Sequence, residues 1–559
     1  MPKAGVANTN VDHLEVAFVI ADFGTRDGEL YAPADEVLLS DPPADAGATN
    51  LGLEADQAPE GRSGGDRFER SRERFALIVG WVGGEEAREL EHSALESRIE
   101  SDGRELLRLL FQDHLDLRAE RERRVERVED EQGVERRAVE RGHDRPLQTV
   151  FGEVSVKRLA YRCRGERNLY PADGVLNLPD EQASHGVRRL AAIESSRGSF
   201  DEATGQVRER TGLALGKRQI EQLALRAAVD FASFYASSAR SLDEEDNDEN
   251  DVLVLSADGK GIVMRADALR AATAQAAQRA SPKLKTRLSK GEKPNRKRIA
   301  EVGAVYELTP APRTPEQVMA STAHKTMPAP KAKRKWLTAS VLEDAATVVA
   351  ELFEEAERRD PGHERIWVAL VDGNNHQIDR IKTEAKACKV KVTILIDLVH
   401  VLQYLWGAAW CFFTEGDPAA EAWVHEKALA VLEGKAGIVG AAIRRKATRL
   451  GLEDDKRAKA DRAADYLHNK RPYLDYPTAL KNGWPIATGV IEGACRHLIK
   501  DRMDITGARW GLQGAEAILK LRAIRSNGDF DQYWDYHLAQ ERHRNHDSHY
   551  ADGVIPHAA

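Results

Sequence analysis

Two aspartates in this sequence of 559 residues each follow an apolar run typical of a buried strand, and each precedes a glycine. The first is Asp258 in VLVLSADGKG, and the second is Asp372 in WVALVDGN. In an α/β sheet, ligands gather beyond the carboxyl ends of the strands, where an acid can face a crevice. A glycine after the acid removes side-chain bulk and lets the chain turn away sharply. One Asp-Gly pair alone is an ordinary turn signal, but two copies at predicted strand ends favour one shared site.

A third acid, Glu492 in GVIEGACRH, is expected at the start of a helix. Three carboxylates would form an oxygen-rich site for two Mg²⁺ ions about 3.5 to 4 Å apart, for which Mn²⁺ can substitute, and this arrangement serves in-line phosphoryl transfer. Helical spacing puts Arg496 and Lys500 on the same face as Glu492, where they could hold DNA phosphates. An intrahelical salt bridge with a solvated lysine fits that spacing equally well.

The stretch ILIDLVHVLQYLW places Asp397 and His400 three positions apart, where a strand passes into a helix. His400 could position a phosphate or relay a proton beside the acids. Without that context, Asp397 is more often a helix N-cap, and His400 is more often a half-buried histidine.

The elements that must position these residues follow a definite order. After the strand that carries Asp258, strands are predicted over 300–308 and 336–341, a helix over 344–360, a strand over 366–373, a helix, and a strand over 391–397. This order matches the ribonuclease-H-like α/β core. The chain then reads as helical as far as about Tyr476, so we expect an all-helical insertion before the last core helix and a mostly α protein overall.

The N-terminal part is predicted to bind DNA. Residues 199–228 show a helix, a glycine break and a second helix, which is helix-turn-helix spacing, although such pairs also occur in many helical bundles. Four residues near the start of the second helix could reach phosphates and base edges: Lys217, Arg218, Gln219 and Gln222.

Net charge is −9, but residues 279–298 hold nine basic residues against one acid, so a polyanion is the expected partner of this block. Its candidate contacts are Arg287, Lys290, Lys293, Arg296, Lys297 and Arg298. No apolar run approaches the roughly 20 residues of a membrane span, and the N-terminus does not resemble a secretory signal. We therefore expect a cytoplasmic protein.

Composition and periodicity suggest seven segments. They are a poorly ordered stretch (1–65), a charged helical region with a possible role in oligomerisation (66–148), a small β element with the helix-turn-helix (149–240), the first part of the catalytic core (250–400), the helical insertion (401–482), the last core helix (483–526) and the tail (527–559).

Three histidines near the C-terminus, His543, His546 and His549, resemble a metal-binding tract. A disordered polar tail is nevertheless the expected state of that region.

From about residue 145 to 550, the chain resembles the ISKra-type bacterial insertion-sequence transposases, which are DDE enzymes with a Mutator-like layout. The stretches that carry the resemblance include RGSFDEATGQVRERTG, LSADGKGIVMR, WVALVDGN, IDLVHVLQYLW and above all PIATGVIEGACRHLIKDRMDITGARW. Two departures are Gln403, where an acid is expected before YLW, and the first 65 residues, which look unlike the family.

The resemblance implies that Asp258, Asp372 and Glu492 are catalytic and bind the metal ions, and that Asp397-x-x-His400 is a family signature. It implies that the insertion touches transposon-end DNA. The partners would then be transposon-end DNA and target DNA, with a homodimer or larger assembly that pairs two ends, and the protein would associate with the bacterial nucleoid. Two alternatives are a catalytically silent DNA-binding protein descended from a transposase and a structure-selective nuclease of the same fold.

Overall fold

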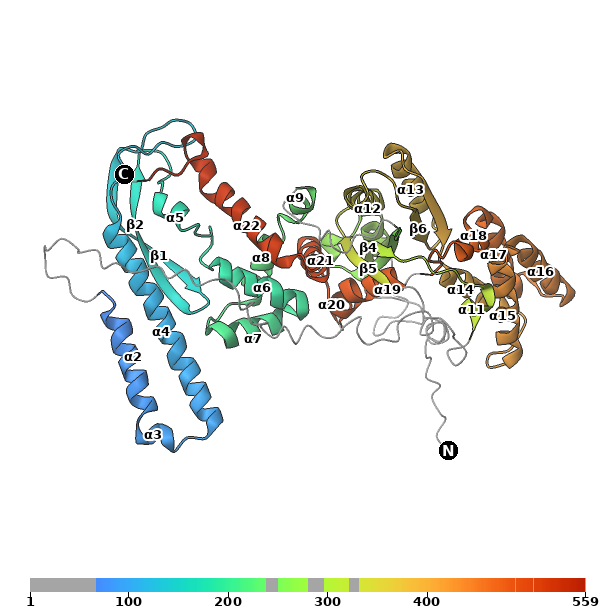
Figure 1. Ribbon diagram of the computed structural model, residues 1–559, viewed down its shortest axis with the longest axis horizontal. Helices are drawn as coiled ribbons and strands as arrows, with labels where there is room; N and C mark the ends of the chain where they lie inside the picture. The colour runs from blue at the N-terminus through green and yellow to red at the C-terminus, as the bar shows by residue number, and fades with distance from the viewer. Residues whose placement is uncertain are drawn as a thin grey trace. The chain divides into compact units, whose positions relative to one another are not determined.

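The computed structural model describes residues 67–237, 250–279, 296–320, 331–487, 489–505 and 507–557. Its internal contacts divide the chain into two compact units (Figure 1). Of the described residues, 250–528 form one unit, here called the core unit, and 67–237 with 529–557 form the other, here called the terminal unit. In the described part of the chain, none of the helices combines the length and apolar composition that a membrane crossing needs.

The core unit is built on a mixed five-stranded sheet, and its strands lie where the apolar runs predict them. In space their order is β5-β4-β3-β6-β7, with β3, β4 and β5 antiparallel and β3, β6 and β7 parallel. Every residue of β6 is buried, as expected for a strand covered on both faces. The strands are β3 (Val252–Val263), β4 (Lys297–Leu308), β5 (Ala332–Ser340), β6 (Trp367–Val371) and β7 (Val392–Ile396).

Helices cover both faces of this sheet. Gly303 in β4 faces α12 so closely that an added Cβ would lie 2.7 Å from the Leu352 side chain. On the opposite face, α19 and the turn after it approach β3, where Cys495 contacts Asp258. A third helix, α21, packs against edge strand β5. Glu516 of this helix accepts hydrogen bonds from Ser340 and Val341 at the end of the strand. The bounds are α12 (Ala345–Arg359), α13 (Asn375–Ala387), α19 (Gly489–Ala494), a π-helical turn (Cys495–Lys500), α20 (Asp501–Met503) and α21 (Leu512–Ser526).

Between β7 and α19 the chain forms a group of helices, in agreement with the predicted all-helical insertion (Figure 1). The insertion helices are α14 (Leu398–Ala409), α15 (Pro418–Leu432), α16 (Ala436–Arg449), α17 (Asp454–Asn469) and α18 (Tyr476–Lys481). Two further short helices of the core unit are α10 (Ala271–Arg279) and α11 (Pro315–Met319).

The terminal unit combines helices with a two-stranded antiparallel sheet. The predicted hairpin is present but longer than expected, because its first strand begins at Ala138, inside the region predicted to be helical. Six of the twelve residues in that strand are exposed and only two are buried, so its pairing with the next strand is what marks it as β. The elements are α2 (Glu69–Val82), α3 (Glu85–Arg88), α4 (His92–Arg121), β1 (Ala138–Thr149), β2 (Gly152–Arg162), α5 (Pro171–Val175), α6 (His185–Arg197), α7 (Phe200–Thr211), α8 (Lys217–Ala227), α9 (Phe231–Ala236) and α22 (Phe530–Asn545).

The two helices of the predicted helix-turn-helix lie at the expected positions, as α7 and α8. Ser199 and Glu202 form a capping box that starts α7. Gly212 ends this helix in the left-handed conformation, with a φ of 75°. A shared core packs α6, α7 and α8 together through Val187, Ala191, Val207, Leu213, Leu215, Ile220 and Leu223.

The histidine tract near the C-terminus is not part of the disordered polar tail that the sequence suggests. Residues 530–545 form helix α22, and His546 after it is buried with its Nε2 2.7 Å from the Leu178 carbonyl oxygen. The prediction was wrong because the partners of this segment lie hundreds of residues earlier in the chain. The histidines of the apparent metal tract therefore belong to a packed helical end.

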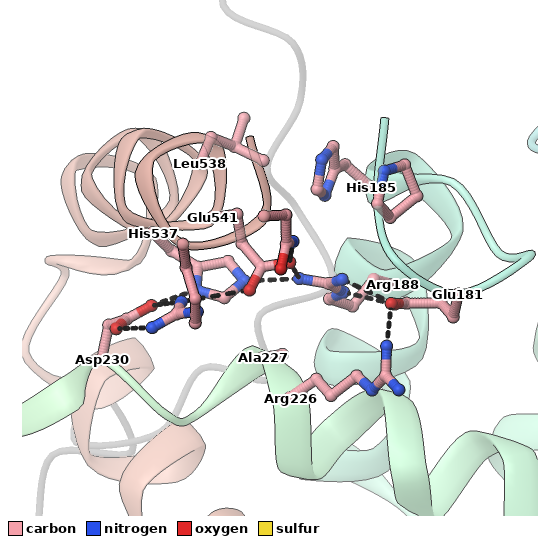
Figure 2. A network of polar contacts seen from close by, with 12 residues as sticks. Glu181, His185, Arg188, Arg226, Ala227, Asp230, His537, Leu538 and Glu541 are labelled. Carbon is pink, nitrogen blue, oxygen red and sulfur yellow. Dashed lines mark hydrogen bonds and ion pairs between the residues drawn. The ribbon is translucent and has the colours of Figure 1, made fainter. Parts of the chain in front are cut away.

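A buried polar network joins α22 to α6 and to Asp230, which follows α8 (Figure 2). Arg188 of α6 is fully buried, and it donates to Glu541 at 2.6 Å and to Glu181 at 2.8 Å. It also approaches Nε2 of His537 at 2.9 Å, while Nδ1 of that ring lies 2.7 Å from an Asp230 carboxylate oxygen. Because Arg188 can only donate, the ring proton belongs on Nδ1, directed at Asp230.

Replacing Arg188 with Met should destabilise the terminal unit, because Glu541 and Glu181 would lose their fully buried partner and keep only Arg544 and Arg226, whose side chains are 42% and 43% exposed. Loss of one partner of a buried pair costs about 3 to 5 kcal/mol. Urea unfolding, with hydrogen exchange of α6 and α22 peptides, measures this cost. The matched control is Arg189→Met, since Arg189 is 41% exposed and pairs with exposed Asp531, and such pairs contribute about 0 to 1 kcal/mol. Equal losses in the two variants would contradict the role of the network.

Candidate active site

Asp258 does not lie at the end of its strand, contrary to the prediction. Strand β3 continues to Val263, and Asp258 pairs with Val302 of β4. Gly259 therefore stays in the strand, opposite Glu301, instead of turning the chain away. The reason is that the antiparallel pairing with β4 extends past the point where the parallel pairing with β6 stops.

Asp372 has the predicted position, immediately after β6 ends at Val371. Gly373 follows with a φ of 92°, a conformation that favours glycine, and the chain turns there. The Asp372 Oδ1 atom accepts a hydrogen bond from the Asn374 N–H at 2.7 Å. Asn374 in turn caps helix α13 by accepting from the His376 N–H at 3.0 Å.

The parallel register brings the two aspartates to the same height in the sheet. The last paired positions of β3 and β6 are Ser256 and Leu370, so Asp258 and Asp372 each lie two residues beyond them. Both residues line one cavity of about 450 Å³. The expectation that these two acids share a site is consistent with this geometry.

Glu492 approaches Asp258 from the face covered by α19. Burial raises the pKa of the half-buried Glu492 carboxyl, as does the charge of Asp258, while nearby Lys260 lowers it. Three residues further along, the buried Cys495 thiol donates to Asp258 Oδ2 at 3.4 Å. Because Gly259 N–H lies 2.6 Å from Asp258 Oδ1, both oxygens of this carboxylate have protein partners.

The donor chemistry of the three acids fits Mg²⁺, which prefers carboxylate oxygen ligands. Asp258 and Asp372 share the cavity, but Glu492 is not among the residues that line it. Within the described ranges, no group of three or more His, Cys, Asp or Glu side chains is arranged to hold a metal ion. Asp258 is the acid that links the other two, because it shares the cavity with Asp372 and its charge raises the pKa of Glu492.

Two further acids line the cavity, and the sequence reading did not single them out. Glu301 lies on the α12 face of β4, and burial followed by the Asp258 charge raises its carboxyl pKa. Asp344 caps α12, and the Thr347 N–H holds the pKa of this carboxyl below its usual range. Arg270 and His376 bring nitrogen groups to the same cavity. Glu301 could have been found only from the β3–β4 register, which no local pattern encodes.

Asp397 and His400 occupy the structural roles given as alternatives to a catalytic one, a helix N-cap and a half-buried histidine. Asp397 caps α14 by accepting from the Val399 N–H at 2.7 Å, and it is buried. His400 is half-buried, and its Nδ1 atom has no hydrogen-bond partner among the described residues.

Arg496 and Lys500 do not share one α-helical face with Glu492, because residues 495–500 form a π-helical turn. Both cationic side chains are exposed, whereas Glu492 is half-buried. Arg496 pairs with Asp501 at 3.6 Å, so the intrahelical pair suggested by the spacing is replaced by another one.

The predicted DNA contacts divide between the two units. Lys217, Arg218, Gln219 and Gln222 are all exposed near the start of α8 in the terminal unit. Lys217 also pairs with Asp201 at 2.7 Å, and Gln219 caps α8 by accepting from the Gly216 N–H at 2.8 Å.

In the core unit, the basic block is described only from residue 296 onward. Lys297 is exposed and lies 3.9 Å from Asp504, whereas Arg298 is half-buried and donates to the Val341 carbonyl at 2.7 Å. Arg296, immediately before β4, is half-buried. Three predicted contacts lie outside the described residues: Arg287, Lys290 and Lys293.

The chain matches no protein-family model and no curated protein.

Gly373→Ala should destabilise the core unit more than another left-handed glycine does. At Gly373, an added Cβ would meet the positive φ and would lie 2.8 Å from the Tyr466 hydroxyl. Gly416→Ala is the matched control, because its φ is 83° and nothing lies within 4 Å of the added atom. Backbone strain of roughly 1 kcal/mol is expected in both variants, with a further loss at Gly373 alone. Thermal unfolding measures the difference, and equal shifts in Tm would show that the close packing has no energetic effect.

Proposed function

We propose that the protein is a DDE transposase with a ribonuclease-H-like core, which cuts and joins DNA at the ends of an insertion sequence. One observation carries this proposal. Asp258 and Asp372, on adjacent parallel strands, reach the same height and line the same cavity, while Glu492 approaches Asp258 from the helix on the other face. Burial and the charge of Asp258 raise the pKa of the Glu492 carboxyl, and a carboxyl pKa shifted in this way is typical of catalytic sites.

The topology supports the proposed core. Three antiparallel strands are followed by two strands parallel to the first, and helices α12 and α13 precede β6 and β7. This is the order expected for a ribonuclease-H-like domain. The helical insertion also lies between β7 and α19, where the resemblance to transposases requires it.

Asp258, Asp372 and Glu492 would hold two Mg²⁺ ions, which when bound activate a water or a 3′-hydroxyl and stabilise charge on the phosphate. The chain's own groups orient the ligands. Gly259 N–H and the Cys495 thiol hold the two oxygens of Asp258, and Asn374 N–H holds one oxygen of Asp372.

Positive side chains would hold DNA beside the acids. Lys260 is close enough to lower the pKa of Glu492, and Arg270 lines the cavity. The exposed start of α8 supplies residues for recognition of the element ends, while the basic segment before β4 supplies sequence-independent affinity. Binding to DNA should therefore weaken as salt concentration rises.

Strand cleavage and joining with labelled element ends and Mg²⁺ tests the proposal. Asp258→Ala, Asp372→Ala and Glu492→Ala should each reduce the rate by about 100-fold or more, while binding of the ends is retained. Glu301→Gln is the matched control, since Glu301 lines the same cavity but lies on the opposite face of the sheet from Glu492. A parent protein that cuts no better than the three variants would contradict the enzyme, and cleavage of junctions without preference for element ends would indicate a nuclease instead.

A further inference from the structure

Helix α17 of the insertion presents two side chains to the turn that carries Asp372. The Tyr466 hydroxyl donates to the Asp372 carbonyl oxygen at 2.9 Å, across 94 residues of sequence. One helical turn later, the Lys470 ammonium donates to the side-chain oxygen of Asn375. Lys470 is the C-cap residue of α17, so the C-terminal end of this helix contacts the turn through both side chains.

The position of Tyr466 is itself closely defined. Its ring stacks on Tyr404 of α14 with 3.8 Å between centroids and 17° between planes. The side chain is 9% exposed, and an added Cβ on Gly373 would lie 2.8 Å from its hydroxyl. The hydroxyl can therefore reach the Asp372 carbonyl only because residue 373 has no side chain.

The turn is also held from the sheet side. The Asp397 N–H donates to the Val371 carbonyl at 2.9 Å, just before the turn. Within the turn, the Asn374 N–H holds Asp372 Oδ1. The hydrogen bond from Tyr466 then fixes the peptide plane between Asp372 and Gly373, which restricts the main-chain rotation that would move the carboxylate.

We propose that Tyr466, supported by Lys470, is a positioning residue that holds the Asp372 carboxylate in its reactive orientation. The helical insertion would then complete the active site as well as touch DNA. This inference rests on the proposed function, because it assigns Asp372 a catalytic role. Misplacement of a reacting group by about 1 Å can cost roughly 100-fold in rate, so loss of one orienting hydrogen bond should be measurable.

Tyr466→Phe tests the inference, since it removes the hydroxyl and leaves the stacked ring. Single-turnover cleavage at saturating DNA should slow by about 10-fold, with a higher Mg²⁺ concentration at half-maximal rate and unchanged DNA affinity. The control is Tyr473→Phe, whose hydroxyl contacts exposed Lys382 at 2.6 Å and which should cleave like the parent. Lys470→Met should also lower the cleavage rate, as Tyr466→Phe does.

Hydrogen exchange of the amides at residues 373–375 provides a readout that does not depend on activity, and it should quicken in Tyr466→Phe. Cleavage and hydrogen exchange equal to those of the parent in this variant would overturn the inference. A loss of cleavage rate that is fully explained by a lower Tm or by weaker DNA binding would overturn it as well. Failure of the proposed function is distinguishable, because the parent itself would then not cleave. If the parent does not cleave but exchange is faster in Tyr466→Phe, the Tyr466 hydrogen bond holds the turn without any catalytic role. That outcome also overturns the positioning claim.

Discussion

The register of β3 against β6 is the constraint on which the site depends. Pairing runs from Leu253 opposite Trp367 to Ser256 opposite Leu370, and it sets the relative height of Asp258 and Asp372. A slip of one residue would move an aspartate by about 3.3 Å and turn its side chain to the other face of the sheet. The apolar residues of both strands are buried between helices, which makes such a slip costly. The core therefore determines the geometry of the acids.

Charge repulsion is the opposing effect. Glu492 and Glu301 both have raised pKa values, caused first by burial and then by the charge of Asp258. Hydrogen bonds from the Gly259 and Asn374 main chain offset part of the cost of gathering carboxylates. Cations bound between the acids would relieve the remaining repulsion, so the same arrangement that destabilises the free protein favours a metal-bound one.

Sequence patterns predicted the features that depend on neighbouring residues. They failed where contacts between residues far apart in the sequence set the structure. The five strands and the Asp372 turn follow from apolar runs and one glycine. Asp258 was placed wrongly at a strand end, because only the long pairing with β4 reveals that β3 continues. Glu301 was missed for the same reason. His546 was assigned to a disordered tail, although it reaches Leu178 across 368 residues and is buried there. No local pattern distinguishes these cases from an ordinary turn or a polar terminus.

The central claim is that Asp258, Asp372 and Glu492 together bind divalent cations. Anomalous diffraction from crystals soaked in Mn²⁺, with and without end DNA, measures this most directly. Anomalous peaks bridging Asp258 to Asp372 and to Glu492, and lost in Asp258→Ala, are the predicted result. No peak at these residues in either crystal, or Mn²⁺ held instead by Glu301 and Asp344, would contradict the account.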